Sequence, residues 1–133
     1  MSAANLSTSD RARLQAALEA RRAALVAETG AQLKGSGDTR VVGLAHRLEE
    51  NDDWAVADAL AELDIAEVRH LVNELADVDA ALARFRDGGY GECVDCGVAI
   101  APARLLAYPT ARRCIPCQEA WERKTAGPQA TAV

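Results

Sequence analysis

The chain has 133 residues, of which half are hydrophobic and only 4% are aromatic, and its 15 basic and 20 acidic residues give a net charge of −5. Such an acidic chain is a poor non-specific DNA binder, because neutralising phosphates requires clustered lysine and arginine. No segment approaches the roughly 20 apolar residues of a membrane span, and the N-terminus lacks the basic start and apolar run of a signal peptide. We therefore expect a cytoplasmic protein with no membrane association.

A long first helix is predicted from the capping residues 7–10 to about Lys34. Alanine, leucine, arginine and glutamate dominate this stretch and favour helix. Its apolar positions are Leu14, Leu18 and Leu25. The glycines within 35–37 break the pattern, and a second helix is predicted to begin at 38–39. Its apolar residues are Val41, Val42, Leu44 and Leu48.

An acid-only stretch without lysine or arginine lies between residues 48 and 68. Its eight acids are Glu49, Glu50, Asp52, Asp53, Asp58, Glu62, Asp64 and Glu67. Such a run is usually the solvated face of a helix. The alternative is a rigid arm that carries carboxylates toward a basic or metal-containing pocket on a larger partner. The residues alone leave both interpretations open.

A heptad stripe marks the helix that follows. Apolar residues step by three and four at Val68, Leu71, Leu75, Val78, Leu82 and Phe85. This spacing is typical of a helix packed along a partner in a coiled coil. A helix from 53 to 86 is about 50 Å long, and the glycines at 88–89 end it. The sequence therefore predicts a mainly α fold with an antiparallel helical hairpin, whose turn lies at either 35–38 or 50–53.

The four cysteines lie in one 25-residue stretch, as the two pairs Cys93–Cys96 and Cys114–Cys117. The spacing C-x2-C-x17-C-x2-C is typical of a four-thiolate zinc site, with each pair on a tight turn, or knuckle. Gly97 can supply the positive φ that such a knuckle needs. In the cytosol, clustered cysteines are more often metal ligands than disulfides. Disulfides or an iron site are the alternatives.

The predicted cofactor is one structural Zn²⁺ ion. Its predicted ligands are Cys93, Cys96, Cys114 and Cys117. A catalytic zinc needs an open position and usually histidine or carboxylate ligands, whereas four thiolates close the coordination sphere. The metal would fold a segment that has too little core to fold alone, and Arg104, Arg112 and Arg113 would offset the charge of the thiolates. We expect no enzymatic activity.

The remaining C-terminal segments are short. Because Pro102 and Pro109 exclude a continuous helix, residues 90–108 are predicted to form short turns around the first knuckle. Residues 118–124 are predicted to form a short closing helix whose Trp121 packs against the zinc end. The predicted domains are the N-terminal helix and coiled-coil hairpin at 1–87, the C4 zinc finger and closing helix at 88–124, and a disordered tail at 125–133.

The most specific motifs surround the cysteines. Residues 89–97 read Gly-Tyr-Gly-Glu-Cys-Val-Asp-Cys-Gly, and residues 104–117 fit the pattern R-L-x-A-x-P-T-A-x-x-C-x-x-C. With these motifs the chain resembles the DksA/TraR family of C4 zinc-finger proteins. The resemblance extends over roughly residues 10–122 and is strongest over 82–117.

This resemblance implies a coiled-coil hairpin on a globular zinc end that binds bacterial RNA polymerase rather than DNA. Members of the family insert the hairpin through the secondary channel of the polymerase and alter the lifetime of initiation complexes. They often act with the alarmone ppGpp, which is then a partner at the polymerase interface. The family's tip motif D-x-x-D-x-A aligns with residues 50–55, which makes Glu50, Asp53 and Ala55 the expected partner-binding residues. Glu50 stands where the family has its first aspartate.

Regulation of transcription through RNA polymerase is therefore the predicted function. Two alternatives stay open: a zinc-stapled helical adaptor for another partner, and a zinc-ribbon module that binds nucleic acid. Charge disfavours the nucleic-acid module, since residues 1–87 hold 10 basic and 16 acidic residues and residues 88–133 hold 5 and 4.

Overall fold

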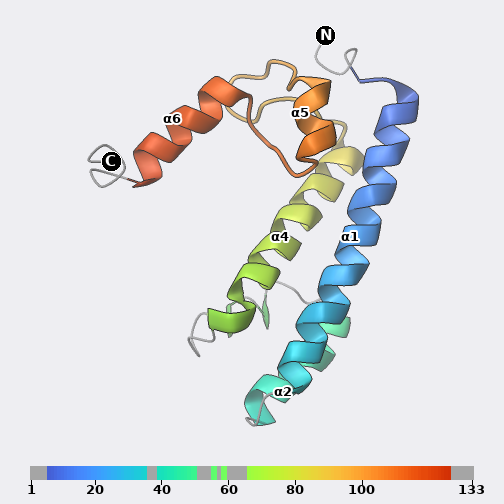
Figure 1. Ribbon diagram of the computed structural model, residues 1–133, viewed down its shortest axis with the longest axis vertical. Coiled ribbons are helices and arrows are strands. Elements are labelled where there is room, and N and C mark those ends of the chain that lie inside the picture. Colours follow the sequence, from blue (N-terminus) through green and yellow to red (C-terminus); the bar gives the residue numbers. More distant parts are fainter. Residues whose placement is uncertain (1–5, 36–38, 51–54, 57, 60–65, 127–133) are drawn as a thin grey trace. The chain divides into compact units, whose positions relative to one another are not determined.

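The computed structural model describes residues 6–35, 39–50, 55–56, 58–59 and 66–126. Its helices are α1 (Thr8–Lys34), α2 (Thr39–Glu49), α4 (Ala66–Asp87), α5 (Pro102–Ala107) and α6 (Ile115–Ala126), as Figure 1 shows. Within the described residues, extended structure is limited to an isolated bridge between Glu92 and Ala99. The predicted mainly α fold is confirmed. None of the described helices is long and apolar enough to cross a membrane.

The chain divides into two compact units. One consists of Ala16–Leu82 and is called the helical unit below. The other consists of Met1–Gln15 and Ala83–Val133 and is called the zinc-end unit. Both α1 and α4 contribute residues to each unit. The domain boundaries expected after residues 87 and 124 stay a prediction.

The first helix begins and ends where its sequence predicts. The Ser7 hydroxyl accepts a hydrogen bond of 3.0 Å from the N–H of Asp10, which caps the first turn. Along α1 the buried side chains recur in steps of four or seven residues, which places them on one face. They are Leu14, Leu18, Leu25, Thr29 and Leu33. After Lys34 the N–H of Gly35 bonds to the carbonyl of Ala31 at 3.1 Å and closes the last turn.

In the helical unit, α1 and α4 run antiparallel (Figure 1), and two ion pairs join them. The Arg21 guanidinium donates two hydrogen bonds, of 2.6 and 2.7 Å, to the Glu74 carboxylate. Arg22 donates one of 2.6 Å to Asp79. The antiparallel pair of helices expected from the sequence is therefore present.

The heptad stripe of α4 is buried over its N-terminal part, but the buried face is wider than a coiled-coil seam. Val68, Leu71, Leu75 and Val78 are all at most 3% exposed, as the heptad predicts. Val72 and Ala81 are buried as well, although they lie outside that stripe. A face of this width is typical of a helix with more than one neighbour. The amphipathic α2 supplies further core side chains: Val41, Leu44, Ala45 and Leu48.

Helices end at both of the turns that the sequence proposes. α1 ends at Lys34 before the first, and α2 ends at Glu49 before the second. Residues 36–38 and 51–54 lie outside the described residues. The expected continuous helix from 53 to 86 is described as helical at 55–56, at 58–59 and from Ala66 onward. The remaining positions of that stretch, with the tail after 126, lie outside the described residues.

The end of α4 leads directly into the zinc end. Gly88 has φ 87°, and the N–H of Gly89 bonds to the carbonyl of Arg84 at 2.9 Å. This bond and the left-handed glycine form a Schellman ending, which agrees with the predicted glycine stop. Residues 90–108 also contain the six-residue helix α5, which the sequence analysis assigned to turns. Pro102 starts this helix without strain, because the first helical position needs no N–H donor.

Candidate metal centre

The first knuckle is a tight turn that places Cys93 and Cys96 on one side. The N–H of Cys93 donates to the carbonyl of Val98 at 2.8 Å, and the N–H of Gly97 donates to the carbonyl of Cys93 at 2.9 Å. Gly97 has φ 80°, which side chains other than glycine rarely adopt. The expected role of this glycine in the knuckle is confirmed.

The second knuckle opens directly into α6. The N–H of Gln118 donates to the carbonyl of Cys114 at 2.8 Å, so Cys117 lies in the first turn of the helix. The closing helix thus begins three residues earlier than the sequence analysis expected. A backbone hydrogen bond of 2.9 Å from the N–H of Val94 to the carbonyl of Arg112 joins the two knuckles.

The four sulfurs converge. The Sγ atoms of all four cysteines lie within 4.8 Å of one another, and none of the four forms a disulfide. The Sγ atoms of Cys96 and Cys114 are 3.8 Å apart. A tetrahedral ion with zinc–sulfur bonds of about 2.3 Å requires sulfurs about 3.8 Å apart. The cluster therefore fits a tetrahedral zinc ion after small adjustments of the longer separations.

The thiols of the cluster differ in acidity. Burial of the Cys93 thiol opposes its ionisation, but the backbone N–H groups of Cys114, Cys96 and Asp95 outweigh burial and lower its pKa to about 6. The pKa of Cys117 is raised, chiefly by its interactions with the sulfurs of Cys114, Cys96 and Cys93. A thiolate is thus favoured at Cys93, and a cation bound between the four sulfurs would favour the thiolate form of its ligands.

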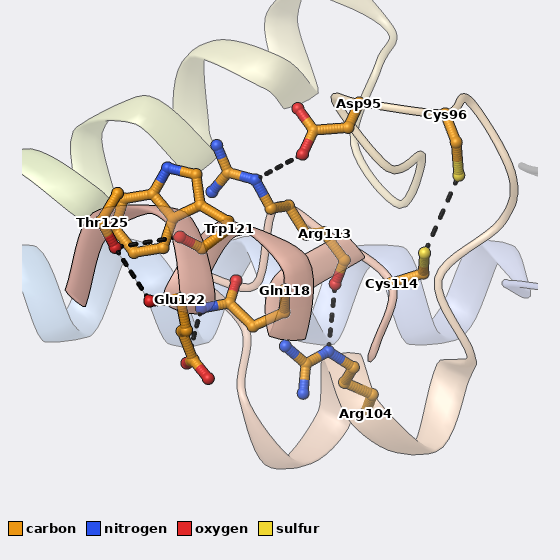
Figure 2. Close-up of polar contacts among 9 residues, drawn as sticks. All are labelled: Asp95, Cys96, Arg104, Arg113, Cys114, Gln118, Trp121, Glu122 and Thr125. Carbon is orange, nitrogen blue, oxygen red and sulfur yellow. Dashed lines mark hydrogen bonds and ion pairs between the residues drawn. The ribbon is translucent and has the colours of Figure 1, made fainter. Parts of the chain in front are cut away.

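Charged and aromatic side chains surround the second knuckle (Figure 2). Arg113 donates a hydrogen bond of 2.7 Å from Nε to Asp95 in the first knuckle, and its guanidinium carbon lies 4.9 Å from the centre of the Trp121 ring. Its backbone carbonyl accepts a bond of 3.1 Å from Arg104 in α5. The Trp121 ring therefore contacts the zinc end through Arg113 and is otherwise 42% exposed.

Tyr90 connects the end of α4 to the zinc end. Its side chain is fully buried and stacks on Phe85 with ring centres 3.9 Å apart and planes 15° apart. Its hydroxyl donates a bond of 2.8 Å to the carbonyl of Pro109, and burial raises its pKa to about 12. A protonated hydroxyl is required for this bond, and the raised pKa extends the pH range of the protonated form on the alkaline side.

Comparison with known proteins identifies this cysteine-rich segment. Residues 88–123 match the family model of the prokaryotic dksA/traR C4-type zinc finger. An uncharacterized protein of Haemophilus influenzae is 44% identical over 55 residues, which cover 40% of this chain and 67% of that protein. The chain belongs to the DksA/TraR family. The resemblance found in the sequence is thus confirmed.

Two further comparisons extend the family assignment. The RNA polymerase-binding transcription factor DksA of Caulobacter vibrioides is 44% identical over 50 residues, which cover 38% of this chain. That match spans only about a third of the DksA relative, 35% of its length. The solved structure of transcription factor DksA2 from Pseudomonas aeruginosa superposes with a TM-score of 0.57 over 91% of this chain and 89% of that chain. At 23% identity, this last likeness shows a common fold.

Of the three residues expected at the tip of a DksA/TraR hairpin, the structure describes Glu50 and Ala55, and the tip assignment stays a prediction. Glu50 is exposed, and its N–H bonds to the carbonyls of His46 and Arg47 at 3.1 and 3.2 Å, which extends the last turn of α2. Ala55 is helical and half-buried. Asp53 lies outside the described residues.

Sequence reasoning missed two features of this DksA/TraR zinc end. It expected Arg113 to offset thiolate charge, but the guanidinium is paired with Asp95. It also gave Tyr90 no role beyond the family motif. The position of Asp95 between two ligands, and of Arg113 immediately before a third, marks both residues as neighbours of the metal site but does not specify that they pair.

Proposed function

We propose that this chain binds RNA polymerase and regulates transcription without catalysis of its own, as a cytoplasmic protein. The observations that carry this proposal are the 44% identity over 50 residues with an RNA polymerase-binding DksA and the cluster of four cysteines within the matched zinc-finger segment 88–123. The shared fold with DksA2 supports it.

In this proposal one Zn²⁺ ion has a structural role. Its ligands are Cys93, Cys96, Cys114 and Cys117. Four thiolates leave no open position for a substrate or a water molecule, so the metal stabilises the fold rather than performing chemistry. Both histidines lie on helices of the other compact unit, His46 on α2 and His70 on α4, and neither belongs to the cysteine cluster.

The contact with the polymerase is assigned to the family tip motif. Glu50, Asp53 and Ala55 are the proposed partner-binding residues, with ppGpp as a further partner at the polymerase interface. The exposed carboxylate of Glu50, within a stretch that has no basic residue, supports an acidic contact. The net charge of −5 supports a protein partner rather than direct DNA binding.

A pull-down with purified RNA polymerase in low salt tests the proposal, followed by transcription from a promoter with a short-lived initiation complex. The wild type should bind and change the transcript yield. Asp53→Asn should remove most of the effect on transcription and leave binding largely intact. Asp58→Asn, at an exposed acid of the same stretch, is the matched control and should behave as wild type.

The outcomes separate the candidate functions. Failure of the wild type to bind polymerase in low salt would sink the proposal and favour a helical adaptor for another partner. Salt-dependent DNA binding by the chain would favour the nucleic-acid module instead. Full activity of the Asp53→Asn variant would remove Asp53 from the contact.

A further inference from the structure

The side chain of Arg113 makes a polar contact between the two knuckles. Its Nε lies 2.7 Å from the Asp95 carboxylate, and its side chain is only 14% exposed, whereas that of Asp95 is 46% exposed. The guanidinium also lies over the indole ring of Trp121 in α6 at 4.9 Å. We call these three residues the Arg113 cluster (Figure 2). A guanidinium in this position is fixed on one side by a carboxylate and on the other by an aromatic face.

The Arg113 cluster lies next to one cysteine of each knuckle. Asp95 directly precedes Cys96, which is exposed, and Arg113 directly precedes Cys114, which is half-buried. The Sγ atoms of these two cysteines are 3.8 Å apart. Cys93, by contrast, is buried. Cys96 and Cys114 belong to different knuckles, so a chelator that removes the metal must displace ligands of both, which is easier once the knuckles separate.

We propose that Arg113, through Asp95 and Trp121, holds the two knuckles together and slows the release of zinc from the four-cysteine site. Arg113 is thus a positioning residue for the metal site. The inference rests on the structural zinc proposed above. It goes beyond that proposal because Arg113 ligates nothing and acts through contacts that are formed by the protein alone.

Charge compensation is the competing explanation for a basic residue at this position. Zinc with four thiolates carries a charge of about −2, and a nearby guanidinium stabilises it. Asp95 has the opposite effect, because its carboxylate adds a negative charge one residue from Cys96. The two explanations therefore predict opposite results for Asp95→Asn. Loss of the carboxylate speeds zinc release if contact between the knuckles matters, and slows it if net charge matters.

The test is the rate of zinc transfer from the zinc-loaded full chain to an excess of a chromogenic chelator. All variants carry Trp54→Phe, so that Trp121 is the single fluorescent indole. Arg113→Gln and Asp95→Asn should each release zinc about fivefold faster, the effect expected for loss of one partly buried ion pair. The double variant should be no faster than the faster single variant, since both changes break one contact. Arg123→Gln, at an exposed arginine of α6, is the control and should release zinc at the wild-type rate.

A second readout separates positioning from a general loss of structure. Arg113→Lys keeps the charge but has no planar fork, so it should restore only part of the wild-type rate. Acrylamide should quench Trp121 more strongly in Arg113→Gln than in wild type, because the guanidinium no longer covers the ring. If Arg113→Gln does not fold, the zinc-release rates of Arg113→Lys and Asp95→Asn are compared with the wild-type rate instead.

The results have distinct meanings. An Arg113→Gln rate within twofold of wild type overturns the inference, and so does slower release by Asp95→Asn. Additive effects in the double variant also overturn it. If the wild type itself binds no zinc, both the zinc proposal and this inference fail. If the wild type holds zinc and only the variant rates disagree, the zinc proposal stands and the role of Arg113 is wrong.

Discussion

The helical unit buries long stripes of leucine and valine, whereas the zinc-end unit leaves many of its described large apolar side chains exposed and makes many directed contacts. Among the described residues of the helical unit, the buried large apolar ones are Leu18, Leu25, Leu33, Val41, Leu44, Leu48, Val56, Val68, Leu71, Val72, Leu75 and Val78. In the zinc-end unit they are Leu6, Leu14, Tyr90, Ile100 and Leu105. The first unit therefore depends on apolar burial, and the second depends on turns, hydrogen bonds and, in the proposed function, a metal.

This difference bears on what each unit tolerates. Apolar stripes accept substitutions of similar volume, because many contacts share the stabilisation. A four-cysteine site accepts no loss of a ligand, because each thiolate completes one coordination sphere. A change that removes the metal should therefore affect one unit far more than the other.

Removal of zinc is expected to have the largest effect. Structural zinc contributes about 10–16 kcal/mol of apparent binding free energy in zinc-finger peptides. Cys114→Ser, or an excess of chelator on the wild type, should therefore abolish zinc binding and unfold the zinc-end unit, while the helical unit keeps its helix content. Zinc content, the fluorescence of Trp121 and the hydrogen exchange of the amides of Leu75 and Tyr90 measure these effects.

The control for this experiment is Val94→Ser. Val94 lies on the same knuckle as Cys93 but is 50% exposed, so its replacement should leave zinc content unchanged. Protection of the Tyr90 amide that survives zinc removal would contradict the proposed dependence of this unit on the metal. Loss of protection at Leu75 together with Tyr90 would show instead that the two units unfold as one.

A cavity in the helical unit should have the second-largest effect. Leu75 on α4 is fully buried, and Leu75→Ala should lower the free energy of unfolding by about 2–5 kcal/mol. Zinc content should stay at the wild-type value. Urea denaturation followed by circular dichroism, with zinc measured on the same samples, checks both statements. Asn73→Ala, at an exposed position of the same helix, is the control. Zinc loss in Leu75→Ala would mean that the packing of the helical unit supports the metal site.

The two units also differ in how much of their structure the sequence predicts. The heptad spacing correctly placed Val68, Leu71 and Leu75 in the core, because periodicity on a helix determines which residues share a face. It missed Val72 and Ala81, since a wider buried face depends on neighbouring helices that the spacing of one helix does not specify.

In the zinc-end unit, the cysteine spacing correctly predicted the cluster of four sulfurs, and the glycine after the first pair correctly predicted the positive φ of Gly97. It did not give the pairing of Asp95 with Arg113, which lie 18 residues apart in irregular segments. Such a contact depends on the backbone path of both knuckles, and no periodic pattern in the sequence predicts that backbone path. For the tip, the motif alone proposes Asp53, which lies outside the described residues.

The smallest expected effect concerns the ion pair between α1 and α4. The hydrogen bonds from Arg21 lower the pKa of Glu74 below its ordinary value of 4.5. A carboxyl whose pKa is lower in the folded state binds fewer protons there, so its stabilisation is present above pH 4.5 and is lost as the pH falls through the folded-state pKa. The side chains of Arg21 and Glu74 are 47% and 41% exposed, so solvent and salt screen the pair.

Glu74→Gln should therefore cause a small loss of stability at pH 7 in low salt, and the difference from wild type should shrink at high salt and at low pH. Urea midpoints of both proteins across this pH range measure it. Glu19→Gln, at an exposed glutamate of α1, is the matched control and should show no such pH dependence. A Glu74→Gln effect that persists in high salt would mean that Glu74 acts through packing of its side-chain methylenes between the helices. Apolar burial would then stabilise even this contact of the helical unit. The helical unit would differ still more from the zinc end, which depends on directed polar contacts.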